Sequence, residues 1–411
     1  MTGRRVWAVA LAGLALAGAC SGDDGDDAGG SSSGSGMAPT TTAPAADEAL
    51  ERARATVEQL ASDELEGRDD GTPGSTAARA YLSGLLEEFA EPLPGADNFE
   101  VPIPGGGTNL IGVIPGGDRA DEVLVLGGHY DHLGRDCDSS EPDDDICNGA
   151  ADNAAGVAVA IEAARALATA EEPPSRTVVI GLWDIEEDSL GGSIAYVTDP
   201  PFPLEDTIAY LNWDIQGANL APSLTDLTVM VGAETGGPNL QAAAERAAGV
   251  SELRTLALSL LFGQGRSDHA TFAEAEVPTV FFSDSNNSCY HTAQDEVETV
   301  DFDKLGQQIL IGTALAEDLA ATDELPEFDA GAPAASFGDA ESMLEVVRSG
   351  QEDFDLFGNQ EVAEAYLADL ERIVEAGEGA FDDAAVSDLL GGAVDIVEAL
   401  TTGECSGYLD Q

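Results

Sequence analysis

Histidine is scarce in this sequence, with four copies in 411 residues, so the surroundings of each copy are informative. His129 follows an apolar run and opens a segment that reads His-Tyr-Asp-His. His291 stands in Tyr-His-Thr, in the loop after a second apolar run. Imidazole nitrogens beside carboxylates are the ligands that zinc prefers in enzymes. These two histidines are therefore the first candidates for a metal site.

Carboxylates follow two further apolar runs, and another carboxylate opens a helix. Asp152 stands where a helical pattern begins, Glu186 and Glu187 follow the run 178–183, and Asp214 ends the run 208–213. Open α/β sheets bind their ligands beyond the carboxyl ends of the strands. We therefore expect these side chains and the two histidines to meet at one edge of a sheet.

Two histidines and three carboxylates suit a pair of zinc ions, each with about four ligands and one open position. One carboxylate must then bridge the ions, and Asp152 at a helix start is placed to do so. Of the adjacent Glu186 and Glu187, one can bind metal while the other remains free as a base. Asp131, two residues after His129, is placed to fix the second nitrogen of that imidazole.

The elements that position these residues alternate along the chain. Apolar runs predict strands, and amphipathic or alanine-rich stretches predict helices. Continuous apolar strands between helices indicate a sheet that is covered on both faces. We predict an α/β three-layer sandwich with a mostly parallel or mixed central sheet, within one catalytic domain, 48–322. The predicted strands are 122–126, 177–183, 208–213, 227–231 and 279–282, and the predicted helices are 48–60, 75–89 with Ser75 near its cap, 152–168, 193–197, 239–248 and 302–319.

The two ends of the chain differ from this pattern. Arg4 and Arg5 precede the apolar run 6–19 and then Cys20, which predicts a lipoprotein-type signal peptide, 1–19. Residues 20–47 are rich in Gly, Ser and Asp and predict a flexible linker behind a lipidated Cys20. We expect a lipoprotein on the outer face of the cell membrane, or a secreted protein if Cys20 is not lipidated. Residues 323–411 are acidic and predict a helical extension.

Four cysteines remain beside Cys20, and four cysteines allow three pairings. Cys137 with Cys147 is the easiest pairing because it closes a short loop, which would stabilise the fold by roughly 2–3 kcal/mol. Cys289 would then pair with Cys405 and attach the C-terminal region to the core. An even number of cysteines agrees with an oxidising compartment.

The charge balance excludes some partners. Against 78 acidic residues there are 16 basic ones, which gives a net charge of −62. Such a surface repels nucleic acid and anionic headgroups, so we expect membrane attachment only through lipid on Cys20. Charge alone does not identify a reaction.

Seven motifs, in this order, give the chain a family resemblance. The sequence resembles the exported bacterial double-zinc aminopeptidases, whose superfamily includes glutamate carboxypeptidase II, the transferrin receptor and glutaminyl cyclase. The matching motifs are Leu-Glu-Gly-Arg in 60–68, Gly-His-Tyr-Asp-His-Leu-Gly (128–134), Asp-Asn-Ala-Ala-Gly (152–156), Glu-Glu (186–187) with Gly-Ser (192–193), Asn-Trp-Asp-Ile (212–215), Ser-Asp-His (267–269) and Tyr-His-Thr (290–292).

The resemblance implies a role for each position. His129 and Asp214 would hold one zinc, Glu187 and His291 the other, and Asp152 would bridge them. It further implies Glu186 as general base and acid, Asp131 as the partner of His129, and Tyr290 as a group that polarises the substrate carbonyl. The implied substrates are peptides with a free N-terminus.

The resemblance also marks positions that carry no metal, and one departure. His132 and the pair Asp268-His269 match family positions that are not ligands, so we expect structural roles for them. Ser189 stands where relatives often have glycine, in the turn after the paired glutamates.

Three alternatives stay open. A carboxypeptidase on the same scaffold would need a basic residue for the terminal carboxylate, and Arg266 is a candidate. A glutaminyl cyclase would use a single zinc, against which the full ligand set argues. An inactive binding protein, like the peptidase-like domain of the transferrin receptor, would have lost ligands or the base, and none is missing here.

Overall fold

The computed structural model describes residues 43–135, 137, 144–403 and 405, and these described residues belong to one compact unit. The predicted signal peptide, Cys20 and nearly all of the predicted linker lie outside the described residues. No helix among those described is long and apolar enough to cross a membrane.

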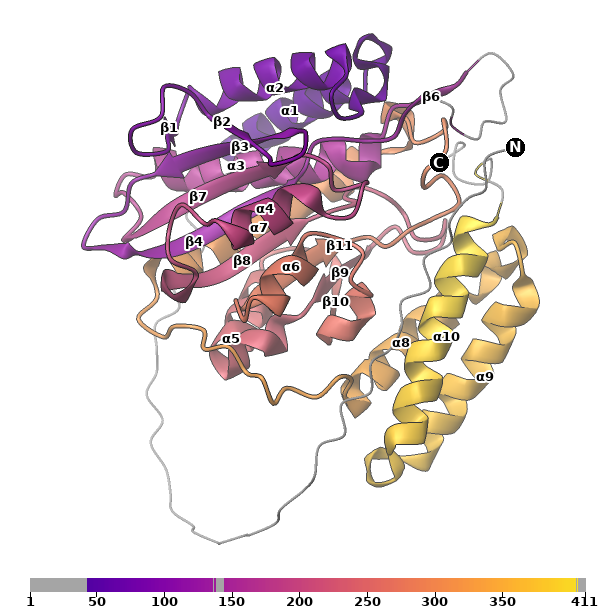
Figure 1. Cartoon of the computed structure of the whole chain (residues 1–411). Helices are drawn as coiled ribbons and strands as arrows, with labels where there is room; N and C mark the ends of the chain where they lie inside the picture. The colour runs from indigo at the N-terminus through magenta and orange to yellow at the C-terminus, as the bar shows by residue number, and fades with distance from the viewer. Residues whose placement is uncertain (1–42, 136, 138–143, 404, 406–411) are drawn as a thin grey trace, which may run out of the picture. The chain divides into compact units, whose positions relative to one another are not determined.

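A nine-stranded mixed sheet forms the centre of the molecule (Figure 1). Its strands run in the order β1-β3-β7-β4-β8-β11-β9-β10, with β2 paired to β3. The strands β7, β4, β8 and β11 are parallel to one another, whereas β3 and β9 run antiparallel to their neighbours β7 and β11. The bounds are β1 (Glu91–Pro92), β2 (Glu100–Pro102), β3 (Thr108–Ile114), β4 (Arg119–His129), β7 (Arg176–Trp183), β8 (Thr207–Trp213), β9 (Leu227–Val231), β10 (Arg254–Leu258) and β11 (Thr279–Ser283), beside the small ribbon of β5 (Gly134–Arg135) and β6 (Ile146–Cys147).

Helices cover both faces of this sheet, which confirms the three-layer prediction (Figure 1). Along β7, Ile180 and Leu182 face one apolar core, whereas Val179 and Trp183 face the other. Successive side chains of a strand point to opposite faces, so burial on both sides explains the unbroken apolar run. One face carries α1 (Ala43–Leu60), α2 (Pro73–Leu86), α3 (Gly156–Thr169), α5 (Gly237–Ala248) and α7 (Phe302–Ala321), and the other carries α4 (Gly191–Thr198) and α6 (His269–Glu274).

Some predicted elements differ from the structure. The helix predicted from Asp152 begins at Gly156, because 150–155 is an irregular turn in which Asp152 has φ −109° and ψ 91°. The cap of α2 is Thr72, whose hydroxyl accepts the N–H of Ser75, so Ser75 is inside the helix. The strands β3 and β10 and the six-residue helix α6 were not predicted; β10 is a half-buried edge strand, and its apolar pattern is weak.

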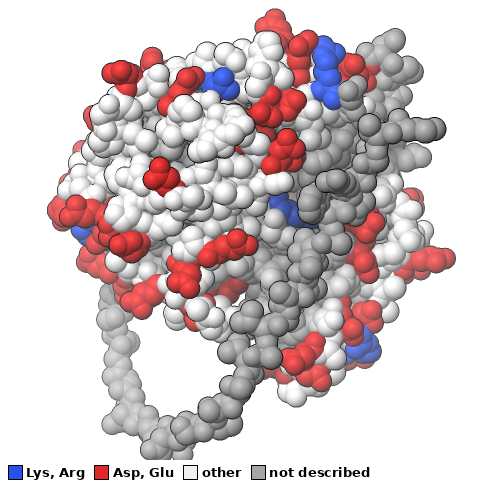
Figure 2. Space-filling model, in the orientation of Figure 1, with Lys and Arg blue, Asp and Glu red and all other residues white. Residues whose placement is uncertain are grey.

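The C-terminal region is helical, as predicted. It comprises α8 (Phe337–Ser349), α9 (Gln360–Ala376) and α10 (Asp383–Thr401), which share an apolar core of their own. Both predicted disulfides, Cys137–Cys147 and Cys289–Cys405, are confirmed, and the second one joins this region to the loop after β11. Acidic side chains are spread over the visible face of the molecule and basic ones are few, in keeping with the net charge of −62 (Figure 2).

Candidate metal centre

The predicted site residues gather at the carboxyl ends of the parallel strands. His129 is the last residue of β4, Glu186 and Glu187 follow β7, and Asp214 follows β8. These strands are neighbours and run the same way, so their ends lie at one edge of the sheet. Asp152 comes from the turn before α3, and His291 from the loop after β11.

The ligand atoms form two triplets that share Asp152. His129 Nε2 lies 3.2 Å from Asp152 Oδ1 and 3.3 Å from Asp214 Oδ1. His291 Nε2 lies 3.1 Å from Asp152 Oδ2 and 3.2 Å from Glu187 Oε2. Two ligand atoms at about 2.0 Å from one tetrahedral zinc are about 3.3 Å apart. In each triplet the histidine nitrogen therefore lies at the spacing of two zinc ligands from each carboxylate, and the two oxygens of Asp152 face different histidines.

The charges around these atoms also suit a cation. His129, Asp152, Asp214 and Glu186 are buried, and His291 Nε2 makes no hydrogen bond of good geometry although two carboxylate oxygens lie within 3.2 Å of it. Burial and the neighbouring carboxylates raise the pKa of Glu186 well above its usual value, although His129 opposes them. Carboxylates crowded in a buried place repel one another unless positive charge compensates them. The donor set thus fits bound zinc.

Asp131 lies against the Nδ1 side of the His129 ring. Its carbonyl oxygen is 3.2 Å and its carboxylate 3.5 Å from His129 Nδ1, so the ring's other nitrogen, Nε2, faces the triplet. The same carboxylate accepts the backbone N–H groups of Glu186 and Glu187 at 3.2 and 3.3 Å. Asp131 therefore positions both the imidazole and the loop of the paired glutamates.

His132 contacts the site as a hydrogen-bond partner. Its Nδ1 lies 2.6 Å from Glu187 Oε1, which is shorter than the separation of two ligands on one tetrahedral zinc. It also lies 4.0 Å from Asp152 Oδ2. The cluster of His132, Asp152 and Glu187 has compatible donor atoms, but the 2.6 Å contact favours a hydrogen bond that orients Glu187.

The turn that carries Asp152 is held from outside itself. The backbone N–H groups of Ala151 and Asp152 donate to the carboxylate of Asp295 at 2.8 and 3.0 Å. The side-chain amide of Asn153 donates to the carbonyl of Trp213 at 2.8 Å. These contacts replace the helical hydrogen bonds that the turn lacks, and they fix the carboxylate between the two triplets.

Arg68 is a positioning residue whose role the sequence did not reveal. Its side chain is fully buried, and it donates to the carbonyls of Tyr130 at 2.7 Å and Gly149 at 2.7 Å. It also donates to the carbonyls of Leu60, Asn148 and Asp152. One guanidinium thus joins the end of β4 to the turn before α3. The motif 60–68 contains Arg68, but nothing in the motif indicates contacts with residues so far along the chain.

Tyr290 and the pair Asp268-His269 lie beside the triplets. The ring of Tyr290 stacks on His291 with centroids 3.7 Å apart, and burial raises the pKa of its hydroxyl well above the usual value. The hydroxyl is therefore a hydrogen-bond donor at neutral pH. His269 stacks on Phe281 at 4.2 Å, and burial lowers its pKa to about 3, so it stays neutral. Burial raises the pKa of Asp268 to about 7.

Ser189 occupies a backbone conformation that suits glycine. Its φ is +80°, and it stands in the exposed turn after Glu186 and Glu187. A side chain in the left-handed region costs about 1–2 kcal/mol, whereas glycine loses about 0.5–1 kcal/mol through backbone entropy. Glycine adopts this φ without the steric cost that a side chain carries.

We predict that Ser189→Gly raises the free energy of unfolding by up to about 1 kcal/mol, measured by urea denaturation. Asp188→Gly, next to it in the same turn and not at positive φ, is the matched control and should lower stability. Equal effects of the two variants would show that φ at residue 189 carries no strain.

Comparisons with known proteins agree with this geometry. Residues 109–312 match the model of peptidase family M28. A probable zinc metalloprotease of Pyrenophora tritici-repentis is 25% identical over 311 residues, covering 63% of each chain. A probable glutamate carboxypeptidase of Arthroderma benhamiae is 31% identical over 170 residues, 38% of this chain and 21% of that one. Leucine aminopeptidase 1 of Phaeosphaeria nodorum is 27% identical over 261 residues, 57% and 63% of the two chains.

Solved structures share the fold. The LapA aminopeptidase of Legionella pneumophila superposes with a TM-score of 0.56 at 19% identity, over 70% of this chain and 78% of that chain. The alignments with the curated relatives described above span 21% to 63% of those relatives' own length. These likenesses place the described domain among zinc exopeptidase folds.

Proposed function

Because residues 109–312 of this chain belong to peptidase family M28, we propose that the protein is a co-catalytic di-zinc aminopeptidase that removes single residues from peptide N-termini. The observation that carries the proposal is the pair of ligand triplets joined by Asp152, with all four nitrogen–oxygen separations between 3.1 and 3.3 Å. Zinc in such a pair supplies Lewis acidity, which lowers the pKa of an attacking water and polarises the substrate carbonyl.

The proposed ligands follow the two triplets. His129 and Asp214 would hold one zinc and Glu187 and His291 the other, with Asp152 shared between them. These imidazole nitrogens and carboxylate oxygens are the donor atoms that catalytic zinc takes in proteins. Asp131 and His132 act through hydrogen bonds to His129 and Glu187.

Glu186 is the proposed general base and acid. Its Oε2 lies 4.0 Å from His129 Nε2, farther than the 3.1–3.3 Å between each histidine nitrogen and its two carboxylate ligands. His129, Glu186 and Glu187 also form a group that could hold a metal ion, and on the longer distance we assign Glu186 as a free carboxylate beside the ligands. In this role it takes a proton from the attacking water and returns it to the leaving amine. The hydroxyl of Tyr290 donates a hydrogen bond to the carbonyl oxygen on which negative charge develops.

The charge of the site favours a free α-amine over a terminal carboxylate. Carboxylates dominate the site, and a substrate ammonium group complements them. Of the described residues that line the cavity next to the ligands, Arg266 is the basic one. It supports the second candidate, a carboxypeptidase, as does the likeness to glutamate carboxypeptidases.

The test is hydrolysis of aminoacyl chromogenic amides by the purified protein, with N-terminally free and N-acetylated versions of each. We expect cleavage of the free-amine substrates only, loss of cleavage with a chelator, and recovery on addition of zinc. Cleavage of N-acetylated peptides that end in a free carboxylate would instead support the carboxypeptidase. Activity that survives complete metal removal would exclude both.

A further inference from the structure

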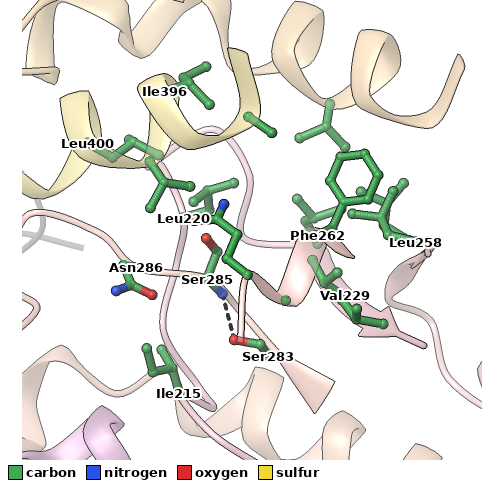
Figure 3. A pocket seen from close by; sticks show the side chains of 18 of the residues that line it. Ile215, Leu220, Val229, Leu258, Phe262, Ser283, Ser285, Asn286, Ile396 and Leu400 are labelled. Carbon is green, nitrogen blue, oxygen red and sulfur yellow. Dashed lines mark hydrogen bonds between the residues drawn. The ribbon is translucent and has the colours of Figure 1, made fainter. Parts of the chain in front are cut away.

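A cavity leads from the metal centre into the C-terminal helices. Its lining begins at Asp152, Glu186 and Asp214, and its volume is about 140 Å³. Apolar side chains from the sheet line one side of it, among them Val229 on β9 and Leu258 on β10. Figure 3 shows these two strands facing a helix that carries Ile396 and Leu400.

The other side of the cavity comes from helices outside the region that matches the family. Residues 109–312 match peptidase family M28, whereas α8 and α10 follow it. The side chains that these two helices bring to the lining are all apolar: Met343, Val346 and Val347 from α8, and Ile396, Val397 and Leu400 from α10, with Ala393 beside them. The chain has a net charge of −62, yet these two helices bring no charged side chain to the cavity.

We propose that α8 and α10 form the wall of the pocket that receives the N-terminal side chain of the substrate, and that this wall selects large apolar residues. The inference rests on the proposed function and names its substrate class. A cavity of about 150 Å³ lined by Leu, Ile and Phe accommodates benzene, so this cavity has room for a leucine, methionine or phenylalanine side chain. A charged side chain would lose its hydration without gaining a partner on this wall.

Polar contacts hold the wall at a fixed distance from the metal centre. The carboxylate of Asp339 on α8 accepts the backbone N–H of Ser259 at 3.0 Å and its hydroxyl at 2.7 Å, directly after β10. The carboxylate of Asp353 accepts the N–H of Ser223 at 2.8 Å. Both contacts join the C-terminal helices to segments whose neighbours line the cavity.

The loop that carries Tyr290 is joined to α10 as well. The hydroxyl of Ser288 donates to the carbonyl of Leu400 at 2.6 Å, and Cys289 is disulfide-bonded to Cys405. Tyr290 and Leu400 both line the cavity. These contacts therefore fix the position of Tyr290 relative to the wall formed by α8 and α10.

The test compares two valine-to-tryptophan variants on α10. Val397 lines the cavity, whereas Val394, three residues earlier on the same helix, is 42% exposed and does not. For the parent we expect kcat/KM for leucyl and phenylalanyl amides to exceed that for the alanyl amide at least tenfold. Val397→Trp should remove most of this preference, whereas Val394→Trp should leave both the preference and the alanyl value unchanged. An unchanged preference in Val397→Trp would overturn the proposal.

A binding measurement separates this proposal from the proposed function. Leucine hydroxamate and glycine hydroxamate, titrated calorimetrically into the zinc-loaded protein, should differ at least tenfold in Kd, and Val397→Trp should abolish the difference. This result in a protein that cleaves no free-amine substrate would refute the aminopeptidase and keep the pocket. Equal binding of the two hydroxamates by a protein that does cleave would refute the pocket alone.

Met343→Ala gives a second variant in case Val397→Trp does not fold. Met343 is half-buried on α8, and its truncation enlarges the cavity without burying new atoms. The preference should shift toward larger residues, with the ratio of phenylalanyl to leucyl kcat/KM rising at least threefold. A constant ratio would contradict the proposed wall.

Discussion

Replacing Glu186 with glutamine should lower kcat about 10²–10⁴-fold, the usual contribution of a positioned general acid and base, and leave two zinc ions bound per chain. The amide keeps the shape of the carboxylate but cannot take a proton. Glu186 stands outside both triplets, 4.0 Å from His129 Nε2, so its loss removes no ligand. Steady-state kinetics and metal analysis of the same preparation measure the two properties together.

The neighbouring residue supplies the matched control. Glu187→Gln makes the same chemical change one position along the chain, at a residue 3.2 Å from His291 Nε2 and 2.6 Å from His132 Nδ1. This variant should lose zinc, whereas Glu186→Gln should not. Metal loss in Glu186→Gln would make Glu186 a ligand, and full activity with both ions bound would assign the base to another group.

Arg68→Met should lower the free energy of unfolding by about 3–5 kcal/mol, because it leaves buried carbonyls without a donor and removes a buried charge from its partners. The guanidinium donates to five backbone carbonyls, and the chain between the first and the last of them spans residues 60 to 152. Chemical denaturation measures this loss. Arg372→Met, at an arginine whose side chain is 55% exposed, should change stability by less than about 0.5 kcal/mol.

Arg68→Lys separates positioning from bulk stability. Lysine keeps the positive charge but presents one compact ammonium group in place of a planar fork with five donors. Asp152 should then be less well fixed, and the Kd for zinc should rise at least tenfold in protein that remains folded. Unchanged zinc affinity in Arg68→Lys would show that the contacts serve the fold alone.

The layers and the chemistry are predictable from the sequence because both follow from short patterns. Buried strands such as β7 appear as continuous apolar runs, and in a parallel sheet the residues after such runs share an edge. The same reasoning places His129, Asp214 and the paired glutamates together on the basis of their positions in the chain alone. The seven motifs carry the family resemblance, and the resemblance implies which ligands share a zinc ion. This assignment of ligands stays a prediction.

Features set by distant contacts are not predictable in this way. The helical pattern predicts that Asp152 opens a regular helix, but Asp295, Trp213 and Arg68 hold its turn in another shape. The segments that form α8 and α10 are recognisable as helical, yet helical periodicity does not say which protein surface a helix meets. That surface is evident only from the packing.

The Cys289–Cys405 bond has a consequence for biosynthesis. Its two cysteines are separated by 116 residues, whereas Cys137 and Cys147 are separated by 10. If the chain enters an oxidising compartment N-terminus first, Cys137 and Cys147 arrive there almost together, so their bridge is able to close early. Cys289 arrives well before Cys405 and has no native partner until the last helix has followed. The loop with Tyr290 and His291 would then acquire its covalent link to the C-terminal region only after the whole chain has entered that compartment.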